Sequence, residues 1–136
     1  MRYLERLVVK RALLTFMLIF VAVSAQAGND PSIQGTLRED IQKSMNSFIS
    51  HQSIGGVMSL YDAVDGKLLR LKLDSLHSGI VKKGDFYVSC ADFVDQSGRA
   101  IDVDFLVLPG ERGVQTTQAI VHSVDGKKRK YHLESK

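Results

Sequence analysis

The hydrophobic pattern of the chain changes period once, and its first part predicts a helix. Thr36 and Glu39 fit the S/T-x-x-E capping box, in which each side chain satisfies a backbone amide at the start of a helix. Gly55 and Gly56 end the pattern. We expect one amphipathic helix over about residues 37–52. Its apolar face comprises Leu37, Ile41, Met45, Phe48 and Ile49.

From residue 57 onward, apolar and polar side chains alternate with the period of two that is typical of β-strands. Asp-Gly pairs at 65–66 and 125–126 lie between strand-forming segments, which is a strong hairpin signal. Residues 95–98, Asp-Gln-Ser-Gly, are predicted to form a four-residue turn between two further strands. The predicted strands are Val57–Tyr61, Lys67–Leu73, Gly79–Lys83, Phe86–Val94, Arg99–Leu108, Val114–Val124 and Lys127–Leu133.

This element order predicts an α+β fold in which the N-terminal helix packs on a curved antiparallel meander sheet. Residues 28–35 are expected to form a flexible N-terminus and residues 36–136 a single domain. The helix face should contact Leu69, Leu71, Val88, Cys90, Val103 and Phe105.

The order of one helix and a long meander resembles the cystatin-like and nuclear-transport-factor-like folds, which implies a helix held against a curved sheet. The segment Phe86–Val107 (FYVSCADFVDQSGRAIDVDFLV) also resembles small, uncharacterised exported bacterial proteins. Neither resemblance implies an activity. The Q-x-V-x-G motif that would indicate protease inhibition is absent from the sequence.

The first 27 residues have the architecture of a secretory signal peptide. Basic residues precede the apolar run Ala12–Val23, which is too short for the roughly 20 residues of a spanning helix. The sequence Ala25-Gln26-Ala27 then offers small residues for signal peptidase. We expect cleavage after Ala27 and a periplasmic or secreted protein with no stable membrane insertion.

Removal of this segment changes the charge of the protein. Residues 1–27 hold four of the 18 basic and one of the 15 acidic residues, so the remainder carries 14 of each. A net-neutral domain lacks the electrostatic footprint of nucleic-acid binding. Nucleic acid is therefore not an expected partner. The expected partner is another exported protein or peptide, and no cofactor is expected. The oligomeric state stays open.

The hairpin Phe86–Val107 carries the candidate site. If residues 95–98 form a four-residue turn, Val94 faces Arg99 and Cys90 faces Val103, which places Cys90 in the core as an inert thiol. The opposite face would be free to bind a partner, because exposed aromatic side chains favour interfaces. The proposed binding residues are Tyr87, Ser89, Phe93, Asp102, Asp104 and Leu106.

The sequence indicates no catalytic residues and no metal site. Its four histidines have no recognisable ligand spacing, and Asp102 with Asp104 is either a solvated acidic pair or a weak cation site. We therefore expect a non-enzymatic exported binding or interaction module. The alternative is a small enzyme with a cavity between helix and sheet, in which an Asp and a His act as acid and base.

Overall fold

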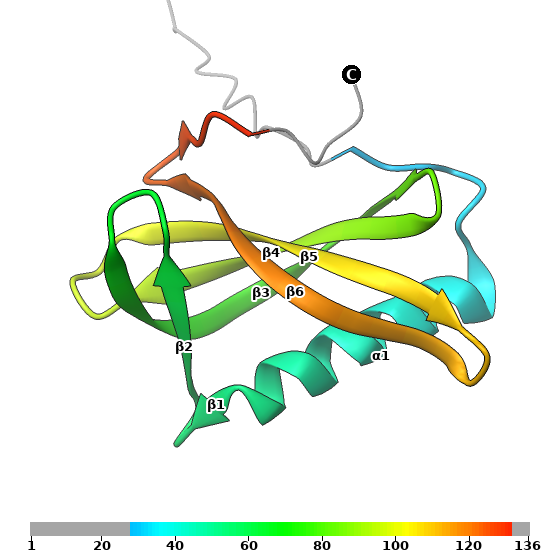
Figure 1. The fold of residues 1–136 in the computed structure, drawn as a ribbon, viewed down its shortest axis with the longest axis horizontal. Helices are drawn as coiled ribbons and strands as arrows, with labels where there is room; N and C mark the ends of the chain where they lie inside the picture. The colour runs from blue at the N-terminus through cyan, green and yellow to red at the C-terminus, as the bar shows by residue number, and fades with distance from the viewer. Residues whose placement is uncertain (1–27, 132–136) are drawn as a thin grey trace, which may run out of the picture.

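The computed structural model describes residues 28–131, which form one helix and one antiparallel sheet. The seven strands follow one another in chain order across the sheet, and the helix lies along one side of it (Figure 1). The predicted α+β fold with a curved antiparallel sheet is confirmed. The elements are α1 (Gly35–His51), β1 (Ser53–Ile54), β2 (Val57–Asp62), β3 (Lys67–Lys83), β4 (Phe86–Asp95), β5 (Ala100–Gly110), β6 (Gly113–Val124) and β7 (Lys127–Lys128).

Helix α1 begins earlier than its sequence pattern predicts, and the predicted capping box is wrong. Gln34 occupies the N-cap position and makes no capping bond through its side chain. The start of the helix is held instead by Arg38, whose Nε donates to the carbonyl of Ile33 at 2.9 Å. The segment before the helix lies against β3, where the Asp30 amide donates to the carbonyl of Ile80 at 2.7 Å.

The apolar face of α1 packs against one face of the sheet, as predicted, but Val88 and Cys90, which were predicted on that face, lie on the other one. Ile41, Met45 and Ile49 are buried, while Leu37 and Phe48 are partly buried against the same core. The ring of Phe48 meets that of Phe105 edge-on, with 6.0 Å between centroids. The sheet side of the core includes Met58, Leu69, Leu71, Phe93, Val103, Phe105 and Val107.

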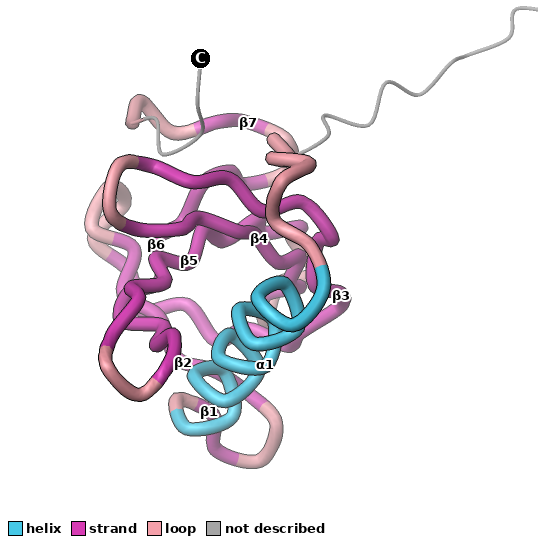
Figure 2. The backbone as a smooth tube through the Cα atoms, turned by 90° about the vertical axis from the view of Figure 1, so that its right-hand side faces the viewer, coloured by secondary structure: helices cyan, strands magenta, loops and turns pink. Residues whose placement is uncertain are grey.

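The strands curl around α1, as the view along the helix shows (Figure 2). The curl brings β2 into contact with β6, and α1 packs mainly on β6 and β5. Ser44 fastens the helix to β6, because its Oγ accepts from the Thr116 amide at 2.7 Å and lies 2.9 Å from Thr116 Oγ1. Helix and sheet therefore enclose one apolar core.

Strand β3 is continuous where the sequence predicted two strands. Its pairing with β4 shifts between Leu73 and Ser75 and again between Leu76 and Ile80, so that the second shift leaves residues 77–79 as a bulge. A β-bulge lets a strand accommodate extra residues without ending. The predicted break at residues 74–78 is thus a local irregularity.

The predicted register of the β4–β5 hairpin is wrong by one residue. Val94 pairs with Ala100 and Cys90 with Asp104, because the Asp95 amide donates to the Arg99 carbonyl and closes a turn of only three residues. Gly98 adopts φ +83° in that turn, as this turn type requires. A slip of one residue exchanges the two faces of a strand. The face of β4 that carries Cys90 therefore points away from the helix.

The predicted signal peptide, residues 1–27, and the last part of the predicted strand Lys127–Leu133 lie outside the described residues. Within residues 28–131, no helix combines the length and the apolar character that a membrane span requires.

Candidate functional site

The six residues proposed for binding do not share one face. Tyr87, Ser89 and Phe93 lie on the helix side of the sheet, whereas Asp102, Asp104 and Leu106 lie on the other side. Phe93 and Ser89 are only 1% exposed, and Asp104 is fully buried. The predicted binding face with two exposed aromatic rings therefore does not exist. The aromatic rings belong to the core, which corrects the sequence-based assignment.

The helix-free face of the sheet instead gathers polar side chains from four neighbouring strands. Strand pairing places Cys90 opposite Asp104 and Asp92 opposite Asp102. His77 from β3 and His122 from β6 reach the same place. We call this group the outer cluster; its members are His77, Cys90, Asp92, Asp102, Asp104 and His122.

Both histidines of the outer cluster occupy irregular positions in their strands. His77 begins the bulge at residues 77–79. His122 is the extra residue of β6, because Val121 pairs with Val103 and Ser123 with the adjacent Asp102. Bulges redirect side chains and are frequent next to functional sites. The two bulges therefore bring imidazoles to a face that a regular alternation would not predict.

Asp104 is the centre of the buried half of the cluster. Its Oδ1 accepts a hydrogen bond from the Cys90 thiol at 2.9 Å, and its Oδ2 lies 2.6 Å from His122 Nδ1. The side chains of Asp104 and His122 are 0% and 5% exposed. A buried carboxylate of this kind needs such partners, because an uncompensated charge in the interior is very costly.

The other half of the cluster is closer to solvent. His77 Nε2 lies 2.8 Å from Asp92 Oδ2, and these side chains are 23% and 46% exposed. Asp102 lies beside them, and its Oδ1 is buried without a hydrogen-bond partner among the described residues. Burial raises the pKa of Asp102 to about 6, against the lowering effect of the His77 and His122 imidazoles, and the carboxylates of Asp104 and Asp92 add a smaller increase.

The bulge that carries His77 is held from both sides. Arg38 donates through Nη1 to the Ser78 carbonyl and through Nη2 to Asn29 Oδ1 at 2.9 Å. Ser89 Oγ donates to the Gly79 carbonyl at 2.7 Å. Backbone carbonyls freed from the strand ladder thereby keep partners. Ser89, predicted as a binding residue, thus supports the bulge from within the fold.

The segment after β7 passes over the same region. The Arg129 amide donates to the His122 carbonyl at 2.7 Å, and its guanidinium pairs with Asp62 and Asp65. Tyr131 is partly buried, and its hydroxyl has no partner in the described part of the chain. Burial, with the carboxylate of Asp104 nearby, raises the pKa of Tyr131.

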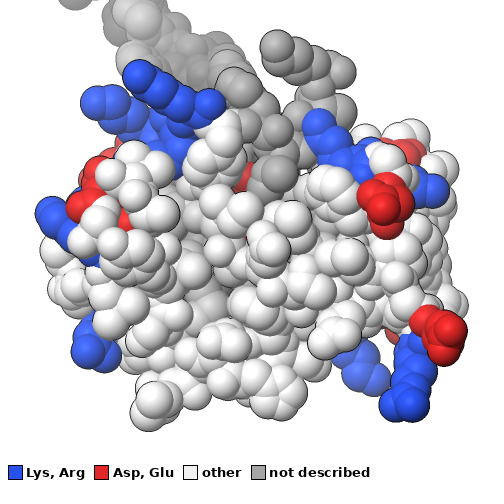
Figure 3. Space-filling view, in the orientation of Figure 1, with Lys and Arg blue, Asp and Glu red and all other residues white. Residues whose placement is uncertain are grey.

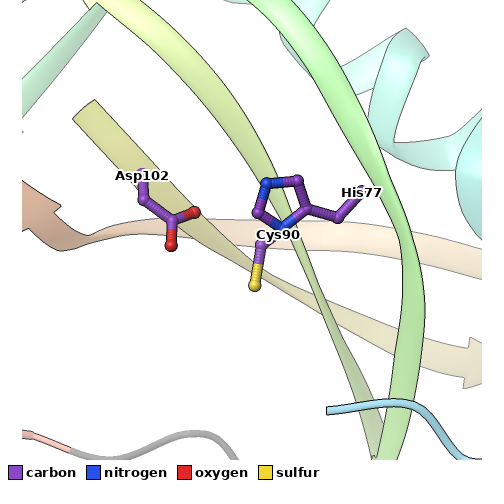
Figure 4. A group of neighbouring side chains, drawn as sticks. All are labelled: His77, Cys90 and Asp102. Carbon is purple, nitrogen blue, oxygen red and sulfur yellow. The ribbon is translucent and has the colours of Figure 1, made fainter. Parts of the chain in front are cut away.

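Three side chains of the outer cluster form a potential ligand set for a metal ion. One ligand atom each from His77, Cys90 and Asp102 lies within 4.8 Å of the other two. The residues come from β3, β4 and β5, and Figure 4 shows the imidazole ring facing the Asp102 carboxylate with the thiol beside them. Nitrogen, sulfur and oxygen donors of these types bind divalent transition metals.

A groove of about 760 Å³ lies elsewhere, between α1 and the β5–β6 turn. Its lining includes Asp40, Lys43, Phe48 and Thr116, and no member of the outer cluster. Groove and cluster are therefore separate features.

The face shown in Figure 3 carries its Lys and Arg side chains at the margins, for example over the end of β6 and over β7, and its middle is uncharged.

The sequence pattern does not predict that His77, Cys90, Asp92 and His122 are neighbours. One signal was present: Gly79 lies between two strand-forming segments, and an isolated glycine within a continuous strand indicates a bulge. No such signal marks His122, because its bulge contains no glycine or proline.

Similarity to known proteins adds nothing to this geometry. Membership of a cystatin-like or nuclear-transport-factor-like family stays a prediction that rests on the order of the elements. Comparison of the chain with protein-family models, with curated proteins and with solved structures finds no match.

Proposed function

We propose that this chain is a small, non-enzymatic exported binding module and that the outer cluster is its binding centre. The observation that supports this proposal is the concentration of three carboxylates, two imidazoles and a thiol on one sheet face, with Asp104 fully buried among them. The proposed binding centre is thus this polar cluster and not the aromatic surface expected from the sequence.

Energetics favour a functional origin for the cluster. Buried polar pairs are often no more stable than apolar side chains of similar volume, because desolvation offsets their attraction. Val81 and Val88 lie on the same face and are buried, so apolar packing is compatible with this surface. A fold selected for stability alone would extend that packing. The polar cluster is better explained by a ligand.

Binding by the outer cluster can be tested by thermal shift. The purified protein is screened against divalent metal ions, organic cations, amino acids and small carboxylates. A ligand that binds only the folded state raises Tm as its concentration exceeds Kd. We expect at least one class to raise Tm in the wild type and to have no effect on Asp102→Asn/Asp104→Asn. Equal shifts in both proteins would place the centre elsewhere, and no shift with any class would contradict the proposal.

Export follows from the pattern of residues 1–27 and is part of the same proposal. We expect mass spectrometry of the mature protein to find Gly28 as its first residue, in the periplasmic or secreted fraction. A chain that begins at Met1 and sediments with membranes would contradict cleavage.

An acid–base enzyme is the second candidate, supported by the 2.6 Å contact between His122 and Asp104. Such an enzyme needs a cavity at the pair, and the groove along α1 is lined by other residues. A screen of ester, amide and phosphoester substrates tests it. Turnover that His122→Gln abolishes and His51→Gln preserves would favour the enzyme over the binding module.

A further inference from the structure

We propose that His77, Cys90 and Asp102 bind a divalent transition-metal ion of the Zn²⁺ type. This inference rests on the proposed function, since it names the ligand class of the outer cluster. The sequence alone indicates no metal site, because the three residues are separated along the chain and belong to different strands.

The donor atoms are close to the spacing that a tetrahedral ion needs. Zn–S, Zn–N and Zn–O bonds of the usual lengths place neighbouring ligand atoms about 3.3–3.8 Å apart. The three donor atoms lie within 4.8 Å of one another. Contraction by about 1 Å is within reach of side-chain rotation. Three protein ligands leave one position of a tetrahedral ion for water or for a fourth group.

One of the ligands, His77, has an outer partner of the kind that metal sites use. Histidine ligands usually hold a carboxylate through the ring nitrogen that does not bind the ion. Asp92 contacts His77 at Nε2, and Nδ1 is the second nitrogen of that ring. In the metal-free protein Asp104 accepts a hydrogen bond from the Cys90 thiol and is itself paired with His122. Binding of the ion releases the thiol proton, and this hydrogen bond is then lost. These contacts fix the orientation of the imidazole and the thiol before an ion arrives.

Asp102 carries an independent indication of a ligand. Its Oδ1 is buried with no hydrogen-bond partner in the described part of the chain, and such atoms are rare in folded proteins. It also shares the face with the carboxylates of Asp92 and Asp104. A divalent cation would satisfy the oxygen and balance the local negative charge.

An ion can reach this site from the solvent side. His77 and Asp92 are 23% and 46% exposed, whereas Asp104 and His122 form the closed floor. Of the three ligands, His77 and Asp102 are partly exposed, whereas Cys90 is only 2% exposed and contacts the buried Asp104. This arrangement fits a bound ion better than a purely structural polar network.

Co²⁺ is the probe for this site, because its absorption spectrum reports coordination and thiolate binding. The purified protein is freed of metal with a chelator and titrated with Co²⁺, and Zn²⁺ is then added in competition. We expect one equivalent of Co²⁺ to bind, with tetrahedral visible bands and a thiolate charge-transfer band that Zn²⁺ removes. A six-coordinate spectrum without a thiolate band would overturn the proposal.

Ligand variants identify the residues. We expect His77→Gln and Asp102→Asn to weaken Zn²⁺ binding by at least about 100-fold, since even loss of an outer partner costs about 10- to 100-fold. Cys90→Ser should abolish the charge-transfer band. His51→Gln and Asp85→Asn, both at exposed positions, are the matched controls and should bind as the wild type does. Circular dichroism confirms that each variant is folded.

The outcomes separate this inference from the proposed function. If the wild type binds no metal but another ligand raises Tm through the outer cluster, the metal assignment is wrong and the binding module stands. If metal binds and the ligand variants retain it as the exposed-site controls do, the site is misplaced. If neither metal nor any other ligand binds, both proposals fail.

Discussion

Asp104 is the residue around which the outer cluster is organised. It is fully buried, and each of its two oxygens has a different partner, the thiol of Cys90 and the imidazole of His122. Hydrogen bonds to a charged group are stronger than neutral ones, and a buried polar group left without partners is costly. The nearby Asp102 lacks this compensation at Oδ1. The burial of the two carboxylates is therefore compensated to different degrees.

Asp102→Asn should stabilise the metal-free protein. Burial raises the pKa of Asp102 from 3.8 to about 6. A raised pKa gives a stability contribution that is present below about pH 4 and is lost as pH rises through about 6. We expect the variant to be more stable by about 1–2 kcal/mol at pH 7, a value reduced for the partial exposure of the group.

Urea unfolding between pH 4 and 8 measures this effect in the presence of a chelator. The wild type should lose stability across pH 4–6 relative to Asp102→Asn, and Asp85→Asn should follow the wild type. A variant that is less stable than the wild type at pH 7 would show that Asp102 has a compensating partner in solution.

At the scale of elements, turns and bulges decide which side chains meet. The helix was predictable because its apolar residues recur over four turns and only one face can be buried. The register of the β4–β5 hairpin was not predictable, because residues 95–98 are compatible with a four-residue turn and with the three-residue turn that Gly98 permits. One residue in this choice moved Cys90 from the core to the outer face.

The same limit applies to the outer cluster. Alternation of side chains assumes an unbroken strand, and the bulges at residues 77–79 and at His122 break it. Asp102 and Asp104 were recognisable as neighbours because residues two apart on a strand share a face. Their pairing with His77 and His122 depends on long-range register, which local pattern does not determine.

Asp95 should be the main determinant of the β4–β5 turn. Its Oδ1 accepts from Ser97 N, Ser97 Oγ and Arg99 N at 2.8–2.9 Å, and its Oδ2 accepts from Arg99 Nε at 2.8 Å. Burial opposes its ionisation, but these bonds outweigh burial and lower the pKa to about 2. We expect Asp95→Ala to cost about 1–3 kcal/mol in free energy of unfolding at pH 7.

The pH dependence provides the control for Asp95. A lowered pKa stabilises the fold above about pH 4 and loses that contribution as pH falls through about 2. The difference between wild type and Asp95→Ala should therefore shrink in acid. A constant difference from pH 7 to pH 2 would show that the carboxylate charge is not involved.

Arg38 should act on the metal site through the β3 bulge, without contacting the ion. It donates to the Ser78 carbonyl, one residue after His77. We expect Arg38→Gln to weaken Co²⁺ binding by about 10-fold, in the range found for outer partners, while the thiolate charge-transfer band remains. Lys43→Gln, an exposed change on the same helix, should have no effect. Loss of the band would instead indicate general unfolding.

At the scale of the whole molecule, Arg129 joins the C-terminal end of the described chain to the β2–β3 turn. Its guanidinium pairs with Asp62, which is buried, and with Asp65, which is exposed. The first strands and the last strand of the sheet are thereby linked across the molecule. Removal of one partner leaves the other charge buried without compensation.

We therefore expect Arg129→Gln to lower the free energy of unfolding by about 2–4 kcal/mol, because Asp62 loses its cation. Lys130→Gln, at the next and exposed position, should change it by no more than about 0.5 kcal/mol. Equal effects of the two variants, measured by denaturant unfolding, would contradict a specific role for Arg129.

The packing of the helix sets a second global expectation. A fully buried Phe typically costs about 3–5 kcal/mol when it is replaced by Ala. Phe105 is fully buried, whereas Phe48 is only partly buried. Phe105→Ala should therefore fall in that range and Phe48→Ala should cost about 2 kcal/mol. A larger loss for Phe48 would mean that the helix carries more of the core than its burial indicates.

The bulge at His122 has a consequence for how this protein could have diverged. Val121 and Ser123 already pair with the adjacent residues Val103 and Asp102, so the ladder is continuous on both sides of His122. A gain or loss of one codon at this point would add or remove an imidazole without shifting either flanking register. Related proteins could thus gain or lose this side chain by insertion or deletion of one residue, which would appear as a gap in a sequence alignment and not as a substitution.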